Sequence, residues 1–192
     1  MHRPILTSPP ATDPVSLTEA KAHLRVDASD EDDLITALIA AASGHLDGHT
    51  GILGRCLVTQ TWVQRYDGWC RVMRLPFPDI SSIVLTYTDS DDAEQTVASS
   101  LYSVFEDSSG SYLRFSDSFT SPTVGPDYGG VSAALTAGYG AASAVPAALK
   151  AAILLHVGTL YENRESVVVG TSTAQLPHAH AALIAPYRRV PV

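Results

Sequence analysis

The fold is decided first by residues 29–46, which read SDEDDLITALIAAASGHL. The large apolar residues recur at spacings of three and four, which places them on one face of an α-helix. They are Leu34, Ile35, Leu38, Ile39, Ala42 and Leu46. The acidic residues Asp30, Glu31, Asp32 and Asp33 precede them, and carboxylates at a helix start oppose the positive end of the helix dipole. The stretch predicts a helix that begins near Ser29 and ends at Gly48 and Gly51.

A second helix is predicted upstream of this one. Ser16-Leu17-Thr18-Glu19 has the Ser-x-x-Glu spacing of a capping box, in which each side chain bonds the other residue's unpaired backbone N–H. This helix runs to about Val26. Residues 1–14 contain four prolines and no apolar period, which is typical of a flexible arm.

Helical patterning returns at the C-terminal end of the chain. Pro146 marks the start, since proline is favoured in the first turn of a helix. The apolar face consists of Leu149, Ile153, His156 or Val157, and Leu160. A last short helix is predicted over 179–184. We expect the helices of both chain ends to pack together through Leu34, Leu38, Leu149, Ile153 and Leu160.

The central residues have a different pattern. Residues 58–63 and 83–87 are rich in β-branched and aromatic side chains, and turn clusters separate such segments. Residues 102–105 and 112–115 flank a Ser-Ser-Gly turn as a hairpin, and residues 131–137 form a closing strand. These short strands predict an antiparallel sheet or a small barrel.

Together these patterns predict an α+β fold that is mainly an α-helical bundle, built from the N- and C-terminal segments, with an inserted antiparallel β-sheet region. Residues 1–14 form a flexible N-terminal arm, and 15–54 with 145–185 form the helical bundle. Residues 55–140 are the inserted β region, and 186–192 are a C-terminal tail.

Composition limits the function further. The chain has 192 residues, twenty acidic against twelve basic, and a formal net charge of −8. Binding of nucleic acid through its phosphates requires the opposite sign, so sequence-reading DNA binding is disfavoured. No apolar run has the ~20 residues of a membrane-spanning helix, and the N-terminus lacks the pattern of a secretory signal. These observations predict a soluble chain made in the cytoplasm, with no membrane partner and with Cys56 and Cys70 reduced.

Enzyme-like motifs are incomplete. His45 and His49 are four residues apart, but the Glu that follows the first His in zinc proteases is missing, and Cys56 is the nearby thiol. Gly138-Tyr139-Gly140 lacks the lysine and Ser/Thr of a phosphate loop. His178 and His180 are expected at the surface or at an interface. We therefore predict no catalytic residue, no cofactor and no metal site.

The chain resembles the head–tail connector proteins of tailed phages, also called adaptor or head-completion proteins. The resemblance begins with PVSLTEAKAHLRV at 14–26 and continues through the acidic stretch and the Ala-rich helix to Gly51. It includes TQTW at 59–62, LPFP at 75–78, AGYG at 137–140, VPAALK at 145–150, YENRE at 161–165 and LIAPYR at 183–188. The segments follow in order over nearly the whole chain, and 88–128 resemble the family least.

The resemblance implies a structural virion protein without catalytic residues, located at the capsid–tail junction of a phage or of a gene transfer agent. Its partners would be the portal protein, the next tail or stopper component, and further copies of itself in a ring of about twelve. At −8 for each chain, such a ring carries a formal charge on the order of −100 before screening. An acidic lumen would let DNA pass without binding it tightly.

Two segments are candidate contact sites. Tyr187, Arg188 and Arg189 form a basic tail that we expect to contact the portal, because the planar arginine fork binds carboxylates on an acidic partner. Asp30, Glu31, Asp32 and Asp33 form either an acidic lumen surface or only a helix start. We expect the isolated protein to be monomeric or weakly associated.

Other functions remain as alternatives. One is another neck or tail-completion protein that also forms rings. A second is a small carbohydrate- or ligand-binding β module with helical flanks, which would use exposed Trp62, Trp69 and tyrosines, although strand aromatics belong more often to a core. An enzyme is the least favoured.

Overall fold

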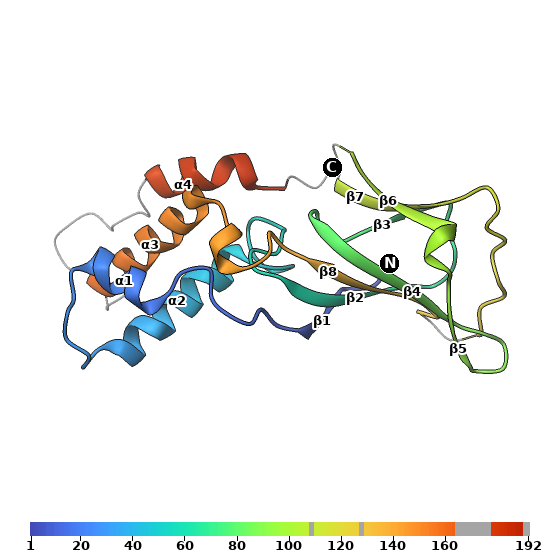
Figure 1. Ribbon diagram of the computed structural model, residues 1–192, viewed down its shortest axis with the longest axis horizontal. Coiled ribbons are helices and arrows are strands. Elements are labelled where there is room, and N and C mark those ends of the chain that lie inside the picture. The colour runs from blue at the N-terminus through green and yellow to red at the C-terminus, as the bar shows by residue number, and fades with distance from the viewer. Residues whose placement is uncertain (108–109, 127–128, 164–177, 190–192) are drawn as a thin grey trace. The chain divides into compact units, whose positions relative to one another are not determined.

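The computed structural model describes residues 1–107, 110–126, 129–163 and 178–189 (Figure 1). The chain divides into two compact units. The described residues of 1–11 and 59–139, together with Arg189, form the first, here called the β unit. The described residues of 12–58 and 140–188 form the second, here called the helical unit.

The β unit contains two antiparallel sheets. The first has five strands in the order β1-β2-β8-β4-β5, and the second has three in the order β3-β7-β6. Their bounds are β1 Ile5–Ser8, β2 Gln60–Tyr66, β3 Val72–Arg74, β4 Ile80–Thr88, β5 Glu94–Thr96, β6 Tyr102–Asp107, β7 Gly110–Phe115 and β8 Val131–Ala137. The predicted hairpin is confirmed, since β6 pairs with β7 from Tyr102 opposite Phe115 to Asp107 opposite Gly110.

The strands of the β unit alternate between a core face and an outer face. Along β8, residues Val131, Ala133, Leu135 and Ala137 are buried and those between them are half-buried. Val131 and Ala133 share a hydrophobic cluster with Tyr66, Leu85 and Leu113 from three other strands. The Tyr66 hydroxyl donates to the Arg74 carbonyl oxygen at 2.7 Å, and burial raises the pKa of this phenol. The β unit therefore has a hydrophobic core of its own.

The mainly helical fold predicted from the sequence is wrong. The described residues contain four α-helices and eight strands, and the strands form two sheets with their own core. The sequence patterns located five of the strands but not β1, β3 or β5, and they did not show that side chains from both sheets pack on one another. The β part is a full structural unit, comparable to the helical one in its internal packing.

The N-terminal arm also differs from the expectation of a flexible segment. Ile5–Ser8 form strand β1, which pairs antiparallel with β2 at the edge of the five-stranded sheet. The amide of His2 donates to the Arg65 carbonyl oxygen at 2.9 Å, and the buried Gln64 side chain donates to the His2 carbonyl oxygen at 2.6 Å. The His2 ring also bonds Asp67 at 2.7 Å, which lowers the pKa of that carboxyl. These contacts order the start of the chain.

The helical unit contains α1 Leu17–Leu24, α2 Asp32–Leu46, α3 Ala147–Glu162 and α4 His178–Ile184, together with short 3-10 turns at Ala142–Ala144 and Ala185–Tyr187. A further 3-10 turn, Ser99–Leu101, belongs to the β unit. The predicted capping box is confirmed, because the Ser16 hydroxyl accepts from the Glu19 amide while the Glu19 carboxylate accepts from the Ser16 amide. Helix α2 begins at Asp32, three positions later than the sequence indicated. Among the described residues, no helix has the length and apolar composition needed to cross a membrane.

Helices α2 and α3 pack together as expected, but the buried face of α2 is offset by one residue. Ile35, Ile39, Ala42 and Leu46 are buried, whereas Leu34 and Leu38 are half-buried. On α3, Leu149, Ile153 and Val157 are buried and Leu160 is half-buried. A helical apolar stripe is more than one residue wide, so a sequence with leucine and isoleucine side by side does not reveal which of the two lies at its centre.

Candidate functional site

The acidic cluster at the start of α2 is partly used inside the helical unit. Asp32 forms a 2.6 Å ion pair with Lys21 of α1, and Glu31 accepts a short hydrogen bond from the Tyr161 hydroxyl of α3. Asp30 and Asp33 are exposed. The cluster therefore has two roles, since half of its carboxylates connect helices and the other half contribute negative charge to the surface.

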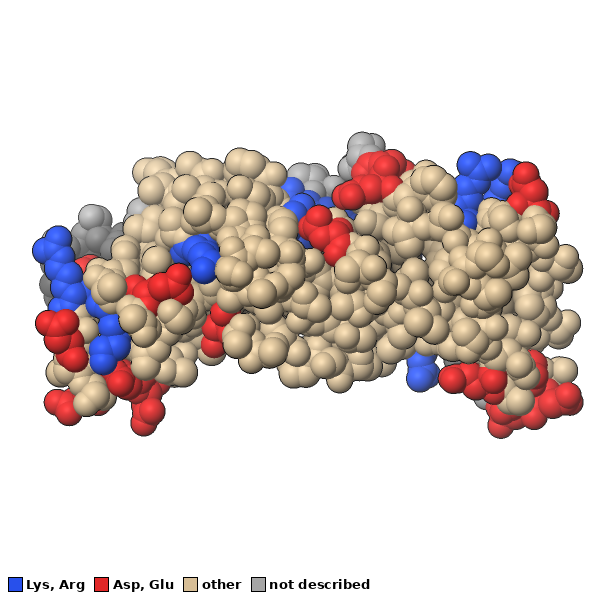
Figure 2. Space-filling view, in the orientation of Figure 1, with Lys and Arg blue, Asp and Glu red and all other residues tan. Residues whose placement is uncertain are grey.

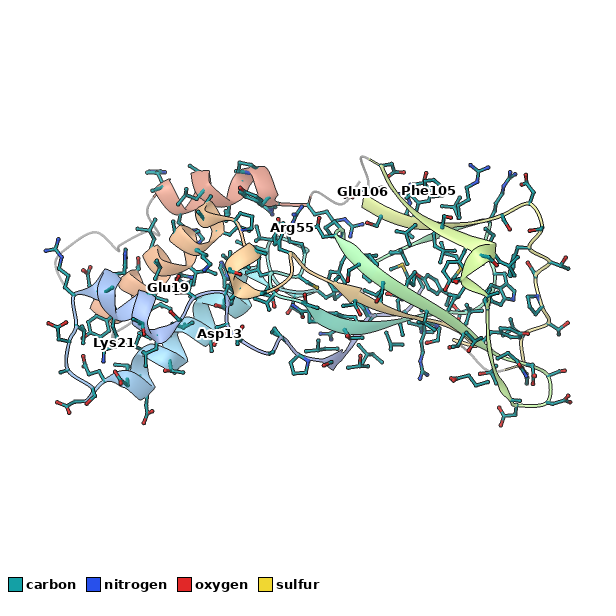
Figure 3. The ribbon with its side chains drawn as sticks, in the orientation of Figure 1. Asp13, Glu19, Lys21, Arg55, Phe105 and Glu106 are labelled. Atoms are coloured by element: carbon teal, nitrogen blue, oxygen red, sulfur yellow. The ribbon has the colours of Figure 1, made fainter. Side chains whose placement is uncertain are left out.

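Both lysines of the chain connect α1 to its neighbours (Figure 3). Lys21 bridges to Asp32 on α2, and Lys150 on α3 bridges to Glu19 at 3.3 Å. The pKa of the Glu19 carboxyl is lowered, first by the hydrogen bond from the Ser16 backbone and then by the Ser16 hydroxyl. The acidic stretch and the capping box thus stabilise one three-helix arrangement.

The basic tail is divided between two environments. The Arg189 guanidinium donates to the carbonyl oxygen of Pro76 at 2.5 Å and to that of Leu75 at 3.5 Å. Tyr187 is half-buried, and Arg188 is exposed. Arg188 is therefore the tail residue whose guanidinium is most accessible to a partner, whereas Arg189 is engaged within the β unit.

Three histidines meet in the helical unit, but they are not the pair that the sequence singled out. The ring of His45 lies 5.2 Å from His156 and 6.5 Å from His180, and those two rings are 5.6 Å apart, measured between centroids. His180 is only 3% exposed, so its expected surface position is wrong. Burial, followed by the neighbouring imidazoles, lowers the pKa of both His156 and His180. Among the described residues, no group of His, Cys, Asp and Glu side chains is arranged to hold a metal ion.

The tryptophans that a ligand-binding module would expose belong instead to packed clusters. Trp62 is 9% exposed, and its ring lies 4.9 Å from that of Phe77. Trp69 contacts the rings of Phe115 and Phe119 at 5.7 and 5.2 Å and donates its indole N–H to the Pro122 carbonyl oxygen. These positions disfavour the binding-module alternative, because neither tryptophan is an exposed side chain: Trp62 is buried and Trp69 is half-buried.

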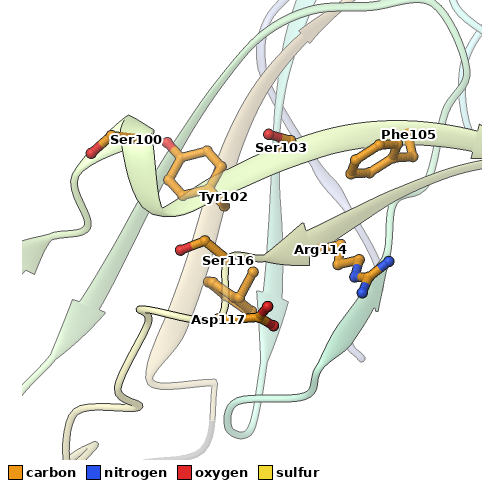
Figure 4. A pocket seen from close by; sticks show the side chains of 8 residues that line it. Ser100, Tyr102, Ser103, Phe105, Arg114, Ser116 and Asp117 are labelled. Atoms are coloured by element: carbon orange, nitrogen blue, oxygen red, sulfur yellow. The ribbon is translucent and has the colours of Figure 1, made fainter.

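A hollow that the sequence did not indicate lies on the three-stranded sheet (Figure 4). Its volume is about 330 Å³, and its lining includes Ser103, Phe105, Arg114 and Asp117. Phe105 is 46% exposed and stacks on Tyr112 with 5.7 Å between centroids. Beside this stack, the Arg74 guanidinium lies over the Tyr112 ring and pairs with Asp107 at 2.7 Å.

The alternation within β7 is the signal that could have located this surface. Ser111, Leu113 and Phe115 are buried, so Tyr112 and Arg114 lie on the outer face. Their partners on that face come from two different strands: Phe105, opposite Tyr112, lies on the adjacent hairpin strand β6, whereas Val72, opposite Arg114, lies on β3, which is distant in sequence. A single sequence does not reveal such cross-strand register.

Comparison with known proteins gives a family match for part of the chain. Residues 14–67 match the model of the phage gp6-like head-tail connector protein family. The segment covers α1, α2 and strand β2. This match confirms the predicted resemblance to head–tail connectors. No curated protein matches the sequence.

Several solved structures share the whole fold. A chain from the neck of an empty gene transfer agent particle, described with C6 symmetry, aligns with a TM-score of 0.77 at 21% identity, covering 100% of this chain and 97% of that one. A chain of the native gene transfer agent virion aligns at 0.72 with 21% identity, again covering 100% and 97%. A chain from the native particle's neck, described with C12 symmetry, aligns at 0.67 with 23% identity, covering 98% and 97%. These likenesses establish a common fold.

Proposed function

We propose that this chain is a structural head–tail connector of a phage-like particle, located in the virion where the capsid joins the tail. The observation that carries the proposal is the agreement of two independent comparisons. The connector family model matches residues 14–67, and the neck chain of a gene transfer agent shares the fold over 100% of this chain. The role is one of assembly, with no chemical step.

In this proposal the chain forms an oligomeric ring beneath the portal. The similar neck chains come from structures described with C6 and C12 symmetry, which supports a ring that contains a multiple of six copies. Such a ring requires head-to-tail contacts between two different patches of each copy, closing after a fixed rotation. The isolated chain remains a monomer or associates weakly, and the portal acts as the template on which the ring closes.

The charge of the chain suits a channel that DNA traverses. The net charge is −8, and exposed carboxylates include Asp30 and Asp33 in the helical unit. Within that unit, Figure 2 shows acidic side chains in groups rather than evenly spread. Negative charge facing the lumen repels the phosphates of a duplex, so DNA passes without being held.

Within this proposal, the portal contact includes the basic tail, and its accessible group is Arg188. Truncation of the tail would also remove the bonds from Arg189 to the Pro76 and Leu75 carbonyl oxygens. A point substitution therefore separates partner binding from folding. Arg3 offers a matched control, because it is an exposed arginine outside the tail.

The test is co-expression of the chain with a portal protein from the same genome, followed by size-exclusion chromatography. The wild-type chain and Arg3→Glu should elute with the portal, whereas Arg188→Glu should elute alone with an unchanged circular dichroism spectrum. If the wild-type chain does not associate with the portal, the proposed function is wrong. If Arg188→Glu binds the portal as well as Arg3→Glu does, the tail contact alone is wrong.

A further inference from the structure

Two adjacent hollows on the β unit form one basic groove. The first, of about 330 Å³, is the hollow lined by Phe105 and Arg114. The second, of about 260 Å³, is lined by Trp69, Arg71 and Phe119. Both hollows are lined by Phe115, Ser116 and Asp117, so they adjoin each other at these three residues. We call this combined surface the arginine groove.

The groove carries unneutralised positive charge. Arg71 and Arg114 are both exposed, and neither has a hydrogen bond or ion pair among the described residues. Asp117 is the acidic residue in the lining of both hollows. Two guanidinium groups against one carboxylate leave an excess of positive charge, in a chain whose net charge is −8.

A surface of the opposite charge lies elsewhere on the same unit. The turn between β4 and β5 and the start of β5 contain Asp89, Asp91, Asp92 and Glu94, all of which except Asp89 are exposed. The Asp89 carboxylate accepts from the amides of Asp91 and Ala93 at 2.9 and 3.0 Å and from the Gln95 side chain at 2.9 Å. Asp89 therefore shapes the turn, and this leaves Asp91, Asp92 and Glu94 to meet a partner. We call these three residues and their turn the acidic hairpin.

The two surfaces occupy different places on the β unit. In Figure 2, acidic side chains gather at the lower right, at the tip of the β4–β5 hairpin, while basic side chains, with acidic ones beside them, lie at the upper right of the same unit. Because the arginine groove and the acidic hairpin lie apart on the β unit, their opposite charges do not pair with each other within one copy. This is the arrangement that a head-to-tail contact requires, in which one patch of each copy meets a different patch of the next.

We propose that the arginine groove of one copy receives the acidic hairpin of the neighbouring copy in the ring, an inference that rests on the proposed function. Copies of a chain with net charge −8 repel one another unless their contact joins opposite charges. Arg71 and Arg114 bind the carboxylates of Asp91, Asp92 and Glu94, since arginine forms two parallel hydrogen bonds with a carboxylate. The exposed ring of Phe105 is covered by the same contact.

The alternative occupant is the phosphate backbone of DNA, which the same guanidinium groups would also bind. The observations favour the hairpin. Binding of a duplex depends on many phosphate contacts at once. The groove offers only two arginines that have no ion pair within the described part of the chain, and they lie beside the carboxylate of Asp117. The hairpin supplies three exposed carboxylates on a short turn, which matches the small size of the groove.

Charge exchange between the two surfaces tests the contact. The groove variant is Arg71→Glu with Arg114→Glu, and the hairpin variant is Asp91→Arg with Asp92→Arg. Arg3→Glu with Arg25→Glu is the matched control, because it makes the same change in charge at exposed arginines outside both the groove and the hairpin. Circular dichroism checks that each variant folds, and negative-stain electron microscopy on portal rings measures assembly.

We expect the wild type and the control to form complete rings, and each of the two variants alone to lose them. An equimolar mixture of the groove variant and the hairpin variant should form rings again, because each hairpin then faces a groove of opposite charge when the two variants alternate. Mass photometry with a tag on one variant should give equal numbers of both in the mixed ring.

Two results would overturn the contact. The first is a complete ring from either folded variant alone, and the second is failure of the mixture to restore rings while the wild type forms them. In the first case, a gel-shift assay in which the wild type binds DNA and the groove variant does not would assign the groove to phosphate. Absence of rings from the wild type itself would overturn the proposed ring as well, so the two failures are distinguishable.

Discussion

The histidine cluster of the helical unit, in which His180 is buried, His156 is half-buried and His45 is exposed, gives the fold a dependence on pH near neutrality. Among the described residues, neither Nδ1 of His156 nor Nε2 of His180 has a hydrogen-bond partner, and both atoms are buried. Each of the two rings lies beside the other and beside that of His45. Protonation would place positive charges next to one another in a poorly hydrated position. The neutral forms are therefore favoured, in agreement with the lowered pKa of His156 and of His180.

This cluster predicts that the protein loses stability in mild acid. Since the folded-state pKa values lie below the ordinary value of 6.5, the unfolded chain takes up protons first as the pH falls. The contribution of these groups is fully present above pH 6.5 and is lost progressively below it. Urea unfolding between about pH 7.5 and about pH 5.5 should show a falling free energy of unfolding.

Two substitutions distinguish the pH dependence of stability that comes from the histidine cluster from that of other titrating groups. His180→Gln should weaken this pH dependence, whereas His178→Gln, at an exposed position on the same helix, should leave it as in the wild type. Equal pH dependence in the two variants would contradict the role given to the cluster.

At the scale of elements, local sequence patterns correctly predicted those structural features that are determined by residues close together in the sequence. The capping box at Ser16 and Glu19 is such a feature, and so is strand β8, whose predicted bounds match the observed Val131–Ala137. Strand β1 was missed because its four residues lie among prolines and owe their order to pairing with β2. The meeting of His45 with His156 and His180 likewise depends on helix packing between distant segments.

The offset on α2 predicts unequal effects of two adjacent substitutions. Ile39 is 2% exposed, so Ile39→Ala should reduce the free energy of unfolding by about 2–5 kcal/mol through lost burial and a cavity. Leu38 is half-buried, so Leu38→Ala should cost clearly less. Urea unfolding of both variants measures the difference, and an equal or larger loss in Leu38→Ala would mean that the buried face is assigned incorrectly.

At the scale of the whole molecule, composition predicted the charge but not its arrangement. The net charge of −8 follows from the sequence alone. The arginine groove brings Trp69, Phe105 and Arg114 together, and their proximity depends on sheet register and on the loops between strands. The sequence patterns predicted an inserted β region at 55–140 between helical segments, but they did not indicate that residues 1–11 belong to the β unit, because strand β1 owes its place to pairing with β2.

The acidic surface predicts weak interaction with DNA. In a gel-shift assay at about physiological salt, the chain should not retard a duplex, because it lacks the excess of basic side chains that neutralises phosphates. Twelve basic residues face twenty acidic ones. Tight, salt-dependent binding of the duplex would contradict the account of a channel that DNA passes through freely.

The central claim is that the chain forms a ring on the portal, and single-particle electron microscopy of the chain mixed with portal rings tests it most directly. The account predicts one added layer that follows the rotational symmetry of the portal, while the chain without portal remains near its monomer mass of 20.3 kDa. A stable two-fold dimer that adds no layer to the portal would contradict it, because an isologous pair uses the same patch on both copies and does not propagate into a ring.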